Sequence, residues 1–124
     1  MNVKIDTKEK FHVITPVDSS LTVNMTEEFS QLLLSCLKKD INNIILNLKD
    51  VDTIDEQVAD CIINSQQLFY DQQCSFVICE LKPEVESFFD QRDMLDLINY
   101  TATESEAWDI VQMEEIEREL FDEE

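Results

Sequence analysis

The sequence predicts a single domain of the α/β class, in which strands and helices pack in layers. Short apolar runs, typical of buried strands, alternate along the chain with longer segments in which apolar residues recur at intervals of three and four, as on one face of a helix. The length of 124 residues is close to the usual size of one domain. Hydrophobic residues make up 44% of the chain, which is enough to form one core.

The first element expected is a pair of strands. Apolar residues at 3–5 and at 11–14 flank the polar segment 6–10, a pattern that predicts two strands joined by a turn. Pro16 ends the second strand because proline has no backbone N–H for the ladder. The only histidine, His12, falls in this second strand, where we expect it to pack at a sheet edge.

A helix and a buried strand follow. Asn24 or Thr26 can cap the helix, whose apolar residues continue at spacings of three and four to Leu37. The run at 44–48 is then almost wholly apolar, which indicates a strand covered on both faces of a parallel sheet.

The second half of the chain repeats this alternation. We expect a loop over 51–55 and a helix over 58–69. A buried strand over 75–81 comes next, and then a short helix with Pro83 in its first turn. Residues 95–100 are expected to form a helix end followed by a short edge strand.

The last element predicted is a helix that ends near residue 120. Thr103 and Glu106 have the spacing of a capping box, which satisfies free amides of the first turn. The helix carries six apolar positions, which are Ala107, Ile110, Val111, Met113, Ile116 and Leu120. Four acids are expected on its solvent face, namely Glu114, Glu115, Glu117 and Glu119. The predicted domain spans residues 1–120, and residues 121–124 are expected to form an acidic tail.

The net charge limits the classes of partner. The chain has 28 acidic and 9 basic residues, a formal charge of −19, and 21 of the acids lie in residues 51–124 with only three bases. Because nucleic-acid affinity depends on Lys and Arg that neutralise phosphates, we expect neither nucleic acid nor an anionic membrane as partner. The acidic half suits a basic protein partner, although solubility alone is sufficient to explain it. Without a secretory signal or a membrane-spanning apolar run, the protein is expected to be cytoplasmic.

No catalytic or metal site is predicted. The four cysteines are Cys36, Cys61, Cys74 and Cys79, and they form no C-x-x-C pair and lie far from His12, so we expect buried free thiols and no zinc. The chain has no glycine, which argues against P-loop and dinucleotide-binding loops. We therefore expect no cofactor and no enzymatic activity; a small-molecule enzyme that uses buried thiols or carboxylates is a third hypothesis behind the two given below.

Several segments, taken in order, resemble the STAS family, named for sulphate transporters and anti-sigma factor antagonists. They are the strand NNIILNL at 42–48, the loop DVDTID at 50–55, the segment FVICELKPEV at 76–85 and the helix start TESEA at 103–107. The resemblance covers nearly the whole chain. It implies a STAS-like α/β fold, with a mixed sheet of four or five strands and about four helices.

The resemblance also bears on regulation. In regulated members the loop before the second helix reads D-S-S-G, and its second serine is phosphorylated by a kinase that is also the anti-sigma factor. Here Asp55 matches the Asp, Glu56 and Gln57 stand where the serines would be, and Val58 replaces the Gly. The phospho-acceptor is missing, so the resemblance implies no phosphorylation switch at this loop. Glu56 suits the helix dipole in any case, and a constitutive mimic of one phosphorylation state is the alternative interpretation.

By this resemblance, the chain is expected to be a protein-binding regulatory domain in bacterial transcription regulation. The partner implied is an anti-sigma factor or a GHKL-type serine kinase. The expected contact surface consists of Thr53, Asp55, Glu56, Gln57 and Asp60. The alternative is a STAS-like accessory subunit of a transport ATPase or of a larger signalling assembly.

Overall fold

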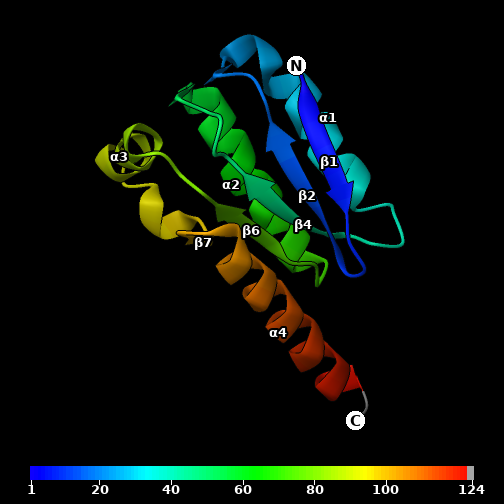
Figure 1. Ribbon diagram of the computed structural model, residues 1–124. Helices are drawn as coiled ribbons and strands as arrows, with labels where there is room; N and C mark the ends of the chain where they lie inside the picture. The colour runs from blue at the N-terminus through cyan, green and yellow to red at the C-terminus, as the bar shows by residue number, and fades with distance from the viewer. Residues whose placement is uncertain (123–124) are drawn as a thin grey trace.

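The computed structural model describes residues 1–122 and confirms an α/β fold with a five-stranded mixed sheet (Figure 1). The elements in chain order are β1 (Val3–Thr7), β2 (Phe11–Pro16), β3 (Ser20–Leu21), η1 (Val23–Met25), α1 (Thr26–Cys36), β4 (Asn43–Asn47), β5 (Thr53–Ile54), α2 (Glu56–Asp71), β6 (Phe76–Cys79), α3 (Pro83–Gln91), η2 (Leu95–Leu97), β7 (Tyr100–Thr101) and α4 (Glu104–Asp122). The expected hairpin, the helices and the buried strands are all present.

The main sheet has the strand order β1-β2-β4-β6-β7. β1 runs antiparallel to β2, and the remaining pairs are parallel. His12 on β2 therefore lies on an inner strand, and its expected place at a sheet edge was wrong. Its Nε2 lies 2.8 Å from the Ile41 carbonyl oxygen and its Nδ1 lies 2.8 Å from the Thr7 hydroxyl. Both ring nitrogens are thus occupied within the fold.

Two hydrophobic cores cover the two faces of the sheet. Ile44, Leu46 and Phe76 pack with α1, α2 and α3 on one face. Ile45 and Val77, which alternate with them along the same strands, pack against α4 on the other face. The alternation follows from the two-residue period of a strand. It explains why the strand runs are apolar throughout.

The expected loop 51–55 contains β5, which forms a second, two-stranded sheet with β3. Thr53 pairs with Ser20 and Ile54 pairs with Leu21, in parallel. This short ladder replaces part of the expected loop. It fixes the start of α2 beside η1.

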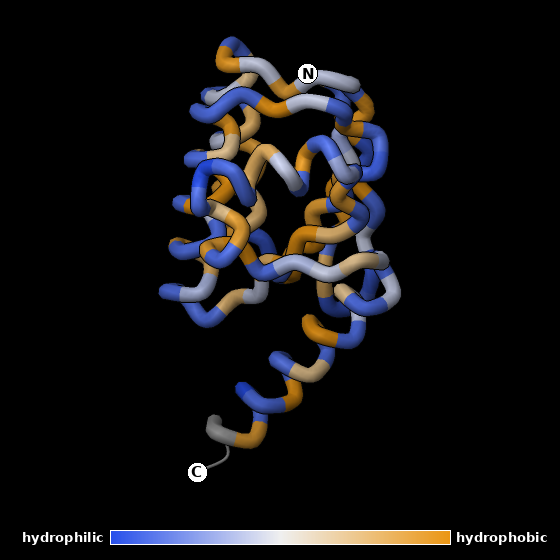
Figure 2. Tube along the Cα trace, turned by 90° about the vertical axis from the view of Figure 1, so that its left-hand side faces the viewer, coloured by the Kyte–Doolittle hydropathy of each residue, from blue (hydrophilic) through white to orange (hydrophobic). Residues whose placement is uncertain are grey.

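Helix α4 is longer than the sheet that it covers. It has 19 residues and spans about 28 Å at 1.5 Å per residue, whereas the five residues of β4 span about 16 Å. Glu104 accepts a hydrogen bond from Asn47 at the end of β4, and Glu115 accepts one from Asn43 at its start, so α4 runs antiparallel to this strand. Its last turns extend past the body of the domain (Figures 1 and 2).

The C-terminal elements match the remaining expectations closely. η2 and β7 form the predicted helix end and edge strand over 95–101. Thr103 caps α4, because its Oγ1 accepts from the Glu106 N–H at 3.3 Å and donates to the Glu106 carboxylate at 3.0 Å. Of the predicted acidic tail, residues 121 and 122 belong to α4, and residues 123 and 124 lie outside the described residues.

Candidate partner-binding surface

Asp55 anchors the start of α2. It is the N-cap residue, with an extended backbone (φ −81°, ψ 154°). Its carboxylate does not bond the first turn of α2 but accepts a hydrogen bond of 2.7 Å from the Val23 N–H at the start of η1. Its own N–H donates to the Leu21 carbonyl at 2.9 Å. Asp55 thus positions the loop, because its carboxylate accepts a hydrogen bond from another element of the same fold.

Three of the predicted residues share the exposed surface of the first turns of α2. Glu56, Gln57 and Asp60 are exposed, whereas Val58 and Ala59 between them are fully buried. The acid Glu56 lies at the first helical position, where the partial positive charge of the helix N-terminus stabilises it. The surface therefore offers two carboxylates and one amide from a rigid element.

Thr53 lies on the same side of the loop but on a different element. It is exposed on β5, and its hydroxyl donates to Ser20 Oγ on β3 at 2.8 Å. The hydroxyl therefore ties the two short strands together. The five predicted residues divide into two that fasten the loop, Thr53 and Asp55, and three that face outward.

A groove of about 690 Å³ runs between α1 and α2 beside this surface. Gln57 and Asp60 line it, whereas Thr53, Asp55 and Glu56 do not. Other lining residues come from η1, from α1 and from further along α2, and they include Val23, Glu27, Gln31, Leu34, Asn64 and Leu68. Sequence reasoning missed the α1 residues. One signal was available in the sequence: Leu34 is apolar but does not belong to the buried face of its helix, which indicates a second apolar surface on α1.

The groove is acidic. Its ionisable carboxylates are Glu27 and Asp60, and its lining contains no Lys or Arg. Its one thiol, Cys61, has a pKa raised above the ordinary thiol value by burial, which disfavours the reactive thiolate. Apolar side chains bordered by carboxylates suit an apolar anchor residue with basic neighbours.

The four thiols are buried and free, as the sequence predicts. Burial raises the pKa of each of them, and that of Cys79 reaches about 12. Within residues 1–122 we find no group of three or more His, Cys, Asp or Glu side chains arranged to bind a metal ion. None of the helices described is both long and apolar enough to cross a membrane.

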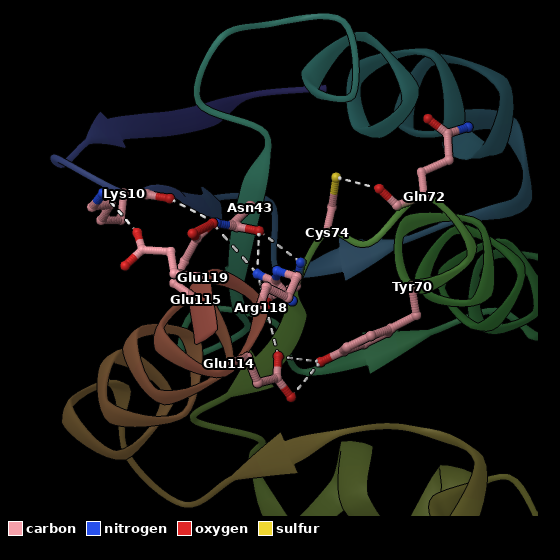
Figure 3. A network of polar contacts seen from close by, with 10 residues as sticks. Lys10, Asn43, Tyr70, Gln72, Cys74, Glu114, Glu115, Arg118 and Glu119 are labelled. Carbon is pink, nitrogen blue, oxygen red and sulfur yellow. Dashed lines mark hydrogen bonds and ion pairs between the residues drawn. The ribbon is translucent and has the colours of Figure 1, made fainter. Parts of the chain in front are cut away.

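A polar network at the amino ends of β4 and β6 fixes α4 (Figure 3). Glu114 accepts hydrogen bonds from the Ser75 hydroxyl at 2.6 Å and from the Tyr70 hydroxyl at 2.9 Å. Arg118 donates to Ser75 Oγ at 3.0 Å and to Asn43 Oδ1 at 3.3 Å. Burial, and then the Glu114 charge, raise the pKa of Tyr70 to about 12.

This network corrects the expectation for the α4 acids. Glu114 and Glu115 were expected on the solvent face, but they turn towards the sheet, and only Glu117 and Glu119 are exposed. The place of Trp108, which the sequence leaves open, is also clear. Its ring packs edge-on against Phe11 at 5.2 Å, and its Nε1–H donates to Glu104 at 3.1 Å.

Comparisons with known proteins agree with this fold. A putative anti-sigma factor antagonist from Thermotoga maritima is similar, with a TM-score of 0.79 and 20% identity over 89% of this chain and 94% of that one. The anti-sigma factor antagonist SpoIIAA in its unphosphorylated form has a TM-score of 0.71 and 16% identity, over 90% of this chain and 96% of its own. Identities this low show a shared fold.

The fold also occurs as part of a larger protein. A murine anion transporter of the solute carrier 26 family is similar with a TM-score of 0.68 and 12% identity, over 84% of this chain but only 18% of the transporter. A search of curated proteins gave no match. The family model described as the STAS domain matches residues 2–107, and the chain therefore belongs to the STAS domain family.

Proposed function

We propose that this chain is a non-enzymatic, protein-binding regulatory domain of the anti-sigma factor antagonist type. The observation that carries the proposal is the exposed polar start of α2, formed by Glu56, Gln57 and Asp60, beside the groove between α1 and α2. The family and the structural neighbours described as antagonists support the same type of function. The partner proposed is an anti-sigma factor or a GHKL-type serine kinase.

Partner binding fits the build of this surface. The groove accepts an apolar side chain of the partner between Leu34 and Leu68, while the carboxylate of Asp60 at its rim attracts a basic residue. The loop that carries Glu56 is held by the hydrogen bond from Val23 to Asp55 and by the β3–β5 ladder. A surface that is already ordered loses little conformational entropy on binding.

The proposal includes the absence of a phosphorylation switch at this loop. SpoIIAA is described in both unphosphorylated and phosphorylated forms. In this chain Glu56 and Gln57 occupy the first two positions of α2, and neither has a hydroxyl group. The carboxylate of Glu56 places a permanent negative charge at this helix N-terminus, where a phosphate would add about −1.5 to −2.

The second candidate is an accessory domain or subunit of a transport ATPase or of a larger assembly. The similarity to the murine anion transporter, in which the matched part is 18% of the chain, favours it. The two candidates differ in their partners. A transport subunit would bind in the second case, and a kinase-like or anti-sigma protein in the first.

The test has two steps and a matched control. Proteins retained by the wild-type chain from native lysate are identified, and the recovered kinase or anti-sigma factor is then purified and titrated calorimetrically. Glu56→Lys should weaken its binding at least about tenfold, equivalent to about 1.4 kcal/mol. Glu84→Lys makes the same change of charge in the first turn of α3, at another exposed helix start, and should leave the affinity unchanged.

Two outcomes contradict the proposal. Equal affinity of the wild type and Glu56→Lys would place the contact surface elsewhere on the domain. Recovery of transporter subunits, with no kinase or anti-sigma factor retained, would favour the accessory role instead.

A further inference from the structure

Helix α4 has a second apolar face that no other element within residues 1–122 covers. Met113, Ile116 and Leu120 are 60%, 56% and 62% exposed. Their spacings of three and four place them in one line on the helix, which we call the α4 stripe. The sequence shows these three residues as apolar positions of the helix without assigning them to a face, and the structure places them in water.

The α4 stripe faces away from the sheet. At about 100° per residue, its three members lie about 140–200° around the helix from the buried Val111. Along the part of α4 in Figure 2 that extends past the domain, hydrophobic positions alternate with hydrophilic ones. The stripe is therefore accessible to another molecule over its whole length.

The orientation of α4 is fixed, so the α4 stripe cannot turn inward. Glu114 is bonded to Ser75 and Tyr70, and Arg118 is bonded to Ser75 and Asn43. Ser75 is fully buried, and rotation of the helix would leave its hydroxyl without these partners. The apolar side chains are thus held in water by the polar contacts of the opposite face.

The charges around the α4 stripe are negative. Asp109 continues its line towards the helix start, and Glu117 and Glu119 lie on its two sides, all three exposed. The Lys10 ammonium lies 3.9 Å from the Glu119 carboxylate, so Asp109 and Glu117 carry the negative charge of this border that is left to a partner. Arg118 is the only base between Glu104 and Asp122, and it points to the sheet. The exposed side of α4 is therefore an apolar line within an acidic border.

We propose that the α4 stripe docks a basic amphipathic helix of a partner protein. Apolar residues of that helix, spaced three and four apart, would pack on Met113, Ile116 and Leu120, and its flanking Lys or Arg residues would pair with Asp109 and Glu117. A second copy of this chain fits poorly, because pairing two α4 helices brings their acids together in chains of net charge −19. An anionic membrane is disfavoured for the same reason.

This surface is separate from the start of α2. Glu115 and Arg118 bond Asn43 at the amino end of β4, whereas α2 begins after the carboxyl end of that strand. The two surfaces also belong to opposite faces of the sheet. Substitutions on the α4 stripe therefore leave the first surface intact, and the two can be tested independently.

The test uses synthetic peptides and backbone NMR of the full chain. The probe is a peptide of about 21 residues with leucine at the a and d positions of a heptad and lysine at e and g. A second peptide has the same composition with the leucine spacing scrambled, and a third has glutamate in place of lysine. The regular basic peptide should shift amide signals of residues 109–120 and bind at least about tenfold more tightly than either control.

Matched variants separate the α4 stripe from general attraction by charge. The triple variant Met113→Ser, Ile116→Ser, Leu120→Ser should bind the basic peptide at least about tenfold more weakly. Leu97→Ser alters a side chain that is 55% exposed on η2 and should have no effect. Because all four side chains are exposed, the variants should keep the wild-type circular dichroism spectrum.

Three results would overturn the proposal. If the scrambled peptide bound as tightly as the regular one, binding would depend on net charge alone and not on apolar contacts with the α4 stripe. Signal shifts outside α4 would place the peptide elsewhere. Sedimentation that shows a dimer of the wild type but a monomer of the triple variant would identify a second copy of the chain as the occupant.

Discussion

The absence of glycine leads to a stability prediction at two helix ends. Gln73 follows α2 with φ of 61° and Asp93 follows α3 with φ of 56°, in the left-handed region. An L-residue there has its Cβ crowded against the backbone, which costs roughly 1–2 kcal/mol, whereas glycine has no Cβ. We expect Gln73→Gly to raise the free energy of unfolding.

The magnitude follows from the contacts at this end of α2. The Cys74 N–H donates to the Phe69 carbonyl at 2.8 Å and the Gln73 N–H to the Tyr70 carbonyl at 3.0 Å. These two bonds form a Schellman motif and hold Gln73 left-handed whatever its side chain. The Gln73 side chain is exposed, so little contact is lost. Glycine also raises the conformational entropy of the unfolded chain, which lowers the free energy of unfolding by roughly 0.4–1 kcal/mol. The net gain expected is about 0.5–1 kcal/mol.

Urea unfolding followed by circular dichroism measures this gain. With a slope of about 1–3 kcal/mol/M, the midpoint should rise by about 0.5 M. Gln72→Gly is the matched control, because Gln72 has φ of −101° and gains nothing from glycine. Glu80→Gly relieves φ of 60° but removes the carboxylate that accepts from the Glu104 N–H at 2.9 Å, so its two effects should offset. A midpoint for Gln73→Gly that equals or falls below the wild-type value would refute the reasoning.

Two further predictions concern hydrogen bonding and pH. Asp55→Ala should lower the free energy of unfolding by about 1–2 kcal/mol, because the Val23 N–H loses its acceptor, while Asp55→Asn keeps an acceptor oxygen and should lower it less; equal urea midpoints for the two variants would contradict this. The free energy of unfolding should also fall as the pH rises from about 9 to 12, because the fold raises the pKa of Cys79 and of Tyr70 to about 12 and the unfolded chain loses these protons first. Urea midpoints that stay constant over this range would exclude the effect.

The sequence is sufficient where the structure depends on local periodicity. The apolar run of β4 and the spaced apolar residues of α2 predict these elements to within a few residues. The short strands β3 and β5 have only two residues each, too few for any pattern. They exist because the carbonyl groups of Ser19 and Leu21 accept hydrogen bonds from the amides of residues 52, 53 and 55, which are more than 30 residues away in the sequence. Tertiary contacts, and not local preference, define them.

The candidate surface divides in the same way. The polar run Glu56-Gln57 at a helix start is visible in the sequence, and the structure places both residues on the exposed side of α2. The groove depends on α1 packing against α2, so Glu27 and Gln31 join the surface through tertiary contact alone. Whether this surface binds the partner stays a prediction.

For α4, the sequence contained information that simple spacing did not use. Ala107 and Val111 are four apart and buried, and Met113 and Ile116 are three apart and exposed, so spacing alone treats the two pairs alike. Angular position around the helix separates them into opposite faces. Only the structure shows which face meets the sheet, because the choice depends on buried partners such as Ser75.

The residue that replaces the family's glycine explains how the loop at α2 is held. Val58 is fully buried in the core shared by the sheet and its helices. Glycine at this position would leave that volume unfilled and let the helix start move. With Asp55 bonded to Val23 on one side and Val58 packed on the other, Glu56 and Gln57 are fixed at both ends. We therefore expect Glu56→Lys to change the affinity for a partner through its charge, because the hydrogen bond of Asp55 and the packing of Val58 on either side of it remain in place.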